Sequence, residues 1–271
     1  MPVEVKYSKL PNGVSLQYAE QGEESGTPII FLHGISDSWR SFERVLPNLP
    51  ESVHAFALTF RGHGDSSRPA EGYLYQDFAK DVVEFMDLNN LDSTIIVACS
   101  TGCYVAEFLA AEHPERVEGL ILVSFPYSQS ENQALNEFRE YVLSSLEDPV
   151  PVEFVREFQE STLVQTVPED FLEAMIEESL KMPASVWKAM IKGFLQDDPY
   201  RAVKKFKTPT LLVWGDQDSM SNKSDQNELQ RIIENSKLLV YEGVGHAVHW
   251  EEPEKFTSDL LSFIKNDLTG S

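Results

Sequence analysis

Cysteine and basic residues are scarce in this chain of 271 residues. Its two cysteines, Cys99 and Cys103, lie within one short stretch and are too few for a disulfide framework. We interpret both as small buried hydrophobic residues. Lysine and arginine total 22 against 44 acidic residues, which gives a formal net charge of −22. This charge argues against nucleic acids and anionic membrane surfaces as partners, because both attract basic proteins.

Long apolar runs are also missing. No run approaches the ~18 residues of a membrane-spanning helix. Residues 1–4 carry neither the basic region nor the apolar core of a signal peptide. We therefore expect a cytoplasmic protein with no membrane partner, acting as a monomer or a homodimer on a small molecule.

Apolar runs that alternate with amphipathic helical patterns fill most of the chain. Two alternating runs around a Pro-Asn-Gly turn predict an N-terminal antiparallel hairpin, residues 3–10 and 14–20. Further strands are predicted at residues 27–32, 53–60, 95–99, 117–125, 210–214 and 238–241, and helices at 38–49, 75–88, 105–113 and 253–266. This alternation predicts an α/β fold with a mostly parallel, doubly wound sheet and helices on both faces.

One segment interrupts the alternation after the sixth strand. From about residue 129 to 201 strand-like runs vanish, and prolines divide the segment into roughly four helical patterns. We interpret residues 127–201 as an inserted helical cap (lid). Residues 1–126 and 202–271 then form the core.

A serine stands where the central strand gives way to a helix. Residues 98–102 read Ala-Cys-Ser-Thr-Gly, and a sharp turn there would expose Ser100 in front of the positive end of the helix. Taken alone, this short pattern also fits an ordinary surface serine after a buried strand.

A serine nucleophile needs a base, and the base needs a carboxylate to orient it. In a doubly wound sheet such groups lie on loops at the carboxyl ends of the strands. His246 follows the predicted strand at 238–241, whereas Asp216 and Asp218 both follow the strand at 210–214. The order is serine, aspartate, histidine, and either aspartate fits it.

Five blocks of sequence resemble one family in the same order and spacing. They are residues 31–34, 61–66, 98–102, 214–218 and 245–253. On these blocks the chain resembles the α/β-hydrolase superfamily, in its capped serine esterase, haloperoxidase-like branch, over nearly its whole length. The match is imperfect at the serine turn, where Ala98 replaces the usual first glycine.

The resemblance implies a role for each matching residue. Ser100 would be the nucleophile, His246 the base and Asp218 the acid, since the second aspartate of the pair carries that role in the family pattern. The backbone N–H groups of Ile35 and Thr101 would form the oxyanion hole. Such a site requires no cofactor and no metal.

The other histidines have structural interpretations. We expect His33 to order the oxyanion loop and His63 to support the site from its glycine loop. His249 follows His246 at a spacing seen in metal sites, but no cluster of further ligands accompanies the pair, so we predict no metal.

We hypothesise a serine hydrolase that cleaves carboxylic esters or lactones of small, largely apolar substrates through an acyl-enzyme. Residues expected to line an apolar substrate pocket are Ser36, Trp39, Phe125, Pro126, Phe154, Phe158, Trp187 and Phe194. For any single one of the cap aromatics, packing within the cap is the favoured interpretation.

Three alternatives stay open. The same triad serves C–C bond hydrolases, perhydrolases and lyases, because fold and triad do not fix the reaction. A ligand-sensing or partner-binding protein could retain a slow or vestigial triad, and sustained turnover would separate it from an enzyme. An engineered or reconstructed scaffold also fits the altered serine turn.

Overall fold

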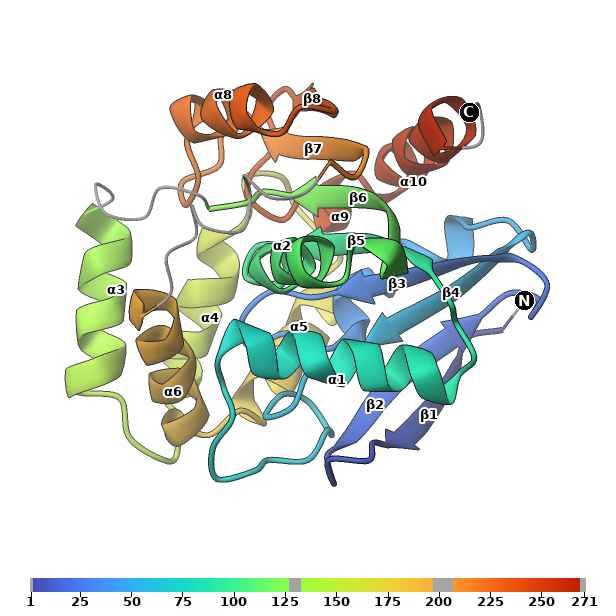
Figure 1. Cartoon of the computed structure of the whole chain (residues 1–271). Helices are drawn as coiled ribbons and strands as arrows, with labels where there is room; N and C mark the ends of the chain where they lie inside the picture. The colour runs from blue at the N-terminus through green and yellow to red at the C-terminus, as the bar shows by residue number, and fades with distance from the viewer. Residues whose placement is uncertain (1, 127–132, 197–206, 269–271) are drawn as a thin grey trace.

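The computed structural model describes residues 2–126, 133–196 and 207–268. An eight-stranded sheet forms the centre of the fold. The strands run in the order β1-β2-β4-β3-β5-β6-β7-β8 (Figure 1). Their bounds are β1 Glu4–Lys9, β2 Ser15–Gln21, β3 Thr27–Leu32, β4 Val53–Leu58, β5 Thr94–Cys99, β6 Val117–Val123, β7 Thr210–Gly215 and β8 Ser236–Tyr241.

The sheet is antiparallel at one edge and parallel elsewhere. β1 pairs with β2 and β2 with β4 in antiparallel fashion, and the register opposes Glu4 to Glu20. All remaining pairs, from β4-β3 to β7-β8, are parallel. The predicted hairpin and the mostly parallel doubly wound sheet are therefore confirmed.

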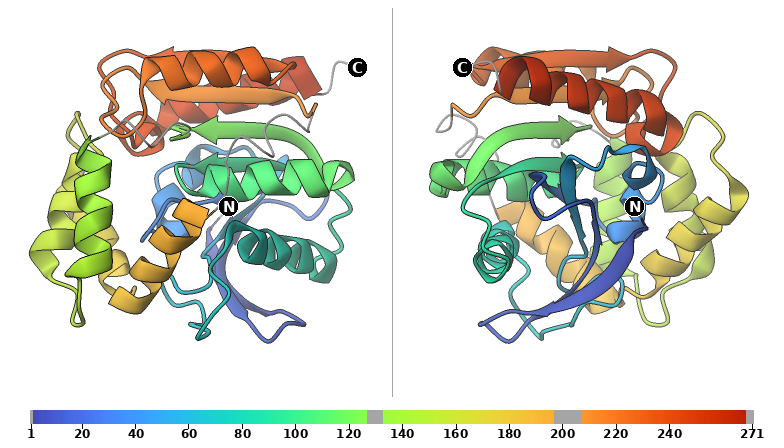
Figure 2. Two further views of the ribbon diagram at one scale, coloured as in Figure 1. Left: turned by 60° about the vertical axis from the view of Figure 1, so that its left-hand side comes forward. Right: turned by 90° about the vertical axis from the view of Figure 1, so that its right-hand side faces the viewer.

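Helices cover both faces of the sheet (Figures 1 and 2). One hydrophobic cluster packs α1 (Tyr75–Leu88), α2 (Gly102–Glu112) and α8 (Lys223–Ile232) on the first face. A second cluster packs the opposite face, and its helical segments are η1 (Trp39–Phe42), η2 (Leu46–Asn48), α9 (Val248–Glu251), α10 (Pro253–Phe263) and η4 (Ile264–Leu268). Burial of these apolar side chains is the main force that holds the layers together.

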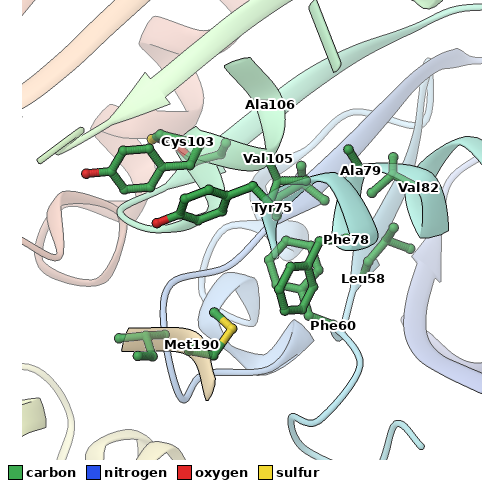
Figure 3. Packing of buried hydrophobic residues seen from close by; sticks show 14 of the residues in the cluster. Leu58, Phe60, Tyr75, Phe78, Ala79, Val82, Cys103, Val105, Ala106 and Met190 are labelled. Atoms are coloured by element: carbon green, nitrogen blue, oxygen red, sulfur yellow. Dashed lines mark hydrogen bonds between the residues drawn. The ribbon is translucent and has the colours of Figure 1, made fainter. Parts of the chain in front are cut away.

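The first cluster also reaches the helices inserted after β6. Figure 3 shows Phe78 of α1, Val105 of α2 and Met190 of α6 (Ala184–Gln196) in one packed group. Apolar contact therefore joins this inserted helix to the core, which favours a fixed position for the helix.

The inserted segment is helical, as predicted. Its described residues form α3 (Gln133–Ser144), α4 (Val152–Ser161), α5 (Glu169–Leu180) and α6. Helices α3, α4 and α6 stand beside the sheet, on the left of Figure 1. The predicted borders of the cap, at residues 127 and 201, lie outside the described residues.

Two predictions of secondary structure were wrong. Residues 38–49 were expected to form one helix, but the structure has the two short 3₁₀ segments η1 and η2 there. Pro47 lies in the second segment, directly after its first residue Leu46, and a proline without an N–H interrupts a continuous α-helix. Helix α8 was missed because its sequence is strongly polar; Asn222 caps it by accepting a hydrogen bond from the Asp225 N–H.

Within the three described ranges, no helix combines the length and apolar character that crossing a bilayer requires.

Candidate active site

Ser100 lies at a strained turn between β5 and α2. Its φ of 50° falls in the left-handed region that residues with a Cβ rarely adopt, and its N–H donates to the Val123 carbonyl at 2.9 Å. A Cβ added at Gly102 would lie 2.6 Å from the Leu32 carbonyl oxygen. The glycine therefore allows α2 to approach β3 closely enough to hold this turn.

Both cysteines of the turn are buried and free. Burial raises the pKa of each thiol well above its ordinary value, so both stay protonated at neutral pH. Cys103 Sγ donates to the Ala98 carbonyl at 3.3 Å, and Cys99 Sγ lies 3.6 Å from His249 Nδ1. Neither thiol has the thiolate character of a reactive cysteine.

His246 is paired with Asp218. Nδ1 of the imidazole lies 2.9 Å from Asp218 Oδ2 and 3.0 Å from Oδ1. An ionised carboxylate only accepts hydrogen bonds, so the Nδ1 atom carries the proton and a neutral ring has its lone pair on Nε2. Nε2 is buried and finds no hydrogen-bond partner among the described residues. The ring is thus set to accept a proton at Nε2.

Asp218 is held as an anion. Burial alone would raise its pKa, but the His246 charge and hydrogen bonds from His246, Ser221 and Met220 outweigh burial and lower it. The Ser221 hydroxyl donates at 2.6 Å and the Met220 N–H at 2.8 Å. The other candidate, Asp216, is exposed and accepts from the Gly243 N–H at 2.7 Å, so it braces a loop.

A cavity of about 70 Å³ brings the predicted site residues together. Ser100, His246, Ile35 and Thr101 all line it. Its other lining residues are Gly34, Asp37, Cys99, Pro126, Leu135, Phe138, Arg139, Phe158, Gln159, Thr162, Ile191, Met220, Ala247, His249 and Trp250. Aromatic and aliphatic side chains make up much of this wall, as in most small-molecule sites.

The two residues expected to form an oxyanion hole, Ile35 and Thr101, both line the cavity beside Ser100. Among the backbone hydrogen bonds of the described ranges outside helices and strands, neither N–H is a donor. His33 braces the first of these loops: its Nε2 accepts from the Phe60 N–H at 3.0 Å, so Nδ1 is protonated and donates to the Gly34 carbonyl at 2.6 Å. Burial lowers the pKa of His33 and keeps it neutral.

His63 packs beside this bracing histidine. The two rings lie 5.0 Å apart, and burial lowers the pKa of His63 to about 4. It is therefore a neutral ring at neutral pH, and its expected role in supporting the site stays a prediction.

The expected pocket residues fall into three groups. Pro126 and Phe158 line the cavity, and Phe154 lines an adjoining hollow of about 250 Å³ that shares Phe158 with it. Four residues are buried and do not line the cavity, namely Ser36, Trp39, Phe125 and Trp187. The side chain of Phe194 lies outside what the structure describes.

Sequence reasoning missed two buried polar residues at the cavity wall, Asp37 and Gln159. Asp37 follows the oxyanion loop by two residues, and this closeness to Ile35 was the one available signal. Burial raises the pKa of its carboxyl to about 6, against the opposing effect of hydrogen bonds from Gln159 and Ser41 and of the His246 charge. Gln159 lies on α4, where a lone polar residue carries no signal in the sequence.

The inserted helices also contact the loop that carries His246. The carbonyl of Thr162, directly after α4, accepts from the His246 N–H at 2.8 Å and from the Ala247 N–H at 3.1 Å. The position of the imidazole therefore depends on the inserted segment as well as on the sheet.

Comparison with known proteins identifies a family. A family model for the alpha/beta hydrolase fold matches residues 27–158 and 170–253. An AB hydrolase superfamily protein of Bacillus subtilis, YisY, is 29% identical over 95% of this chain and 98% of its own length. Lipase 1 of Psychrobacter immobilis is 26% identical over 96% of this chain and 84% of its own length.

A solved structure gives the same fold. The bromoperoxidase of Bacillus anthracis superposes with a TM-score of 0.87 at 23% identity, over 97% of this chain and 100% of its own. The family match, the serine turn and the order of the strands lead to one conclusion: this chain belongs to the α/β-hydrolase family.

Proposed function

We propose that this chain is a serine hydrolase that cleaves carboxylic esters or lactones of small, largely apolar substrates through an acyl-enzyme. The observation that carries the proposal is the His246 imidazole. It is fixed on one side by Asp218 and presents a buried, unpartnered Nε2, within the described residues, at the cavity that also contains Ser100. The lipase among the relatives supports an ester as substrate.

The reaction follows from these positions. His246 Nε2 removes the hydroxyl proton as Ser100 Oγ attacks the ester carbonyl, and Asp218 stabilises the imidazolium that forms. The N–H groups of Ile35 and Thr101 stabilise the oxyanion. His246 then gives its proton to the leaving alcohol, activates water against the acyl-enzyme, and so regenerates Ser100.

The wall of the cavity supports this substrate class. Phe138, Phe158 and Ile191 give it an apolar character, and the volume of about 70 Å³ suits a short acyl group. In this proposal residues 127–201 act as the cap that closes the cavity, over a core made by residues 1–126 and 202–271.

Steady-state hydrolysis of p-nitrophenyl acetate, butyrate and octanoate tests the proposal. We expect many turnovers per enzyme, a preference for the shorter acyl chains, and a loss of about 10⁴ to 10⁶ in kcat for Ser100→Ala. Cys99→Ala serves as the matched control and should retain activity. A single turnover with no further product release would instead favour the ligand-sensing alternative.

A further inference from the structure

A chain of buried polar groups runs behind the oxyanion loop. Cys99 Sγ lies 3.6 Å from His249 Nδ1, and His249 Nε2 lies 3.0 Å from Ser41 Oγ. The Ser41 hydroxyl in turn donates to Asp37 Oδ2 at 3.1 Å. All four residues are buried, so each hydrogen bond replaces one that water would otherwise provide.

The donor and the acceptor of each hydrogen bond in this series follow from the Asp37 carboxylate. Since the Ser41 proton goes to the Asp37 carboxylate, His249 must donate from Nε2 and accept the Cys99 S–H proton at Nδ1. Burial lowers the pKa of His249 to about 3, which fits a neutral ring. Every donor therefore points towards one acceptor, the Asp37 carboxylate.

The second oxygen of that carboxylate is held by the inserted helices. Gln159 Nε2, on α4, donates to Asp37 Oδ1 at 3.0 Å and to Ser179 Oγ, on α5, at 2.7 Å. It also lies 3.5 Å from Ser36 Oγ. The Gln159 side chain is buried, with 1% of its residue surface exposed. One amide thus connects two inserted helices to the loop that follows β3.

That loop is the one that presents the Ile35 N–H. Ser36 has a φ of 67°, a left-handed conformation that persists in a residue with a Cβ only where its surroundings enforce it. The Asp37 N–H closes the turn on the Gly34 carbonyl at 3.4 Å, a long hydrogen bond. The side-chain contacts of Ser36 and Asp37 with Gln159 therefore restrain this strained turn from the side of the inserted helices, in addition to the hydrogen bonds from His33 and Ser41.

We infer that Gln159 is a positioning residue, through which the inserted helices hold the oxyanion loop by way of Asp37. Gln159 acts by fixing the Ile35 N–H at the place where negative charge develops on the substrate. The inference rests on the proposed function, because the Ile35 N–H has this task only if the reaction develops negative charge on a substrate oxygen beside Ser100.

Gln159→Leu tests this inference against Gln165→Leu. Gln165 offers a matched control, since its Nε2 also bridges the inserted segment and the core, at 3.3 Å from the Gly243 carbonyl, away from the oxyanion loop. With p-nitrophenyl acetate we expect kcat to fall about 10²-fold in Gln159→Leu at a KM within about twofold, because the loss is confined to the transition state. Gln165→Leu should match the wild type.

Exchanging the amide of Gln159 and the carboxylate of Asp37 separates a loss of positioning from a loss of folded protein. At a pH high enough to ionise both groups, Gln159→Glu places two carboxylates against each other and should be impaired at least as much as Gln159→Leu. Adding Asp37→Asn supplies a side-chain amide that can donate to the new carboxylate, so the double variant should regain about tenfold or more in kcat over Gln159→Glu.

The outcomes separate the inference from the function it rests on. If the wild type turns over the ester but Gln159→Leu behaves like Gln165→Leu, or if Asp37→Asn does not rescue Gln159→Glu, the positioning role is wrong and the hydrolase stands. If the wild type shows no turnover, the proposed function fails and takes the inference with it.

Discussion

The ring of Trp187 meets the ring of Phe158 at 90°, with 5.6 Å between their centroids. Phe158 lines the cavity beside Ser100, whereas Trp187 is fully buried behind it and packs edge-on against Phe138 and Phe154 as well. Two aromatic residues of the inserted helices thus have different tasks. One faces the proposed substrate, and the other supports the first.

Truncating each ring should separate these tasks. We expect Phe158→Ala to change the acyl-chain preference and raise KM for p-nitrophenyl butyrate, because it enlarges the cavity. Trp187→Ala should lower the free energy of unfolding by about 3–5 kcal/mol, as for other large aromatic truncations in cores. Urea unfolding and steady-state kinetics on both variants check this. A chain-length shift in Trp187→Ala equal to that in Phe158→Ala would contradict it.

Replacing each of the two aspartates after β7 by asparagine tests which one serves His246. Asp218→Asn should lower kcat by about 10⁴, since the imidazole loses the partner that fixes its tautomer and stabilises its charge. Asp216→Asn should stay within about threefold of the wild type, because that exposed residue contacts the Gly243 N–H instead. Equal losses in both variants would show that the loop itself, and not the Asp218 carboxylate, is what matters.

Asp37 should make stability depend on pH. Burial raises its pKa from 3.8 to about 6. Between these two pH values the folded state therefore keeps a proton that the unfolded state has lost. The contribution of Asp37 to stability is therefore fully present below about pH 4 and is lost as pH rises through about 6. The full loss is on the order of 3 kcal/mol.

The asparagine variant isolates this effect. The side chain of Asp37→Asn does not ionise. The free energy of unfolding of the wild type, relative to that of the variant, should therefore be higher at pH 4 than at pH 7. Urea unfolding at both pH values measures it. A difference that stays constant with pH would mean that the carboxyl keeps its ordinary pKa.

The serine turn should tolerate a substitution at Ala98 but not at Gly102. Gly102→Ala places a Cβ 2.6 Å from the Leu32 carbonyl oxygen, and we expect it to destabilise the fold by about 1–3 kcal/mol and to lower kcat by displacing Ser100. Ala98→Gly restores the residue usual in the family pattern and should alter kcat by less than about threefold. Thermal unfolding and ester kinetics on both variants check this. A larger loss of stability or kcat in Ala98→Gly than in Gly102→Ala would contradict it.

Much of the fold was readable from local pattern. The Pro-Asn-Gly turn fixed the hairpin, and apolar β-branched runs marked the buried strands, because a strand covered on both faces must be apolar along its length. Pro47 carries the signal that residues 38–49 do not form one helix, whereas their apolar spacing alone favours a single helix. Helix α8 was missed because polar residues fill most of its length.

The site was readable only in part, for a physical reason. Residues at strand ends can be located from the order of the strands, so Ser100, Asp218 and His246 could be expected to meet. Asp37 and Gln159 come together because α4 contacts the loop that follows β3, and no local pattern records such a contact between segments 122 residues apart. Which aromatic faces the cavity was likewise unpredictable, since helix rotation within the inserted segment decides it.

The most direct test of the central claim is to trap the covalent intermediate. The wild type would be mixed with p-nitrophenyl acetate, quenched in acid during turnover, digested and mapped by mass spectrometry, with Ser100→Ala and Cys99→Ala run in parallel. We predict acetyl on Ser100 in the wild type and in Cys99→Ala, and none in Ser100→Ala. Turnover without any acetyl on Ser100, or with acetyl on Cys99, would contradict the assignment of the nucleophile.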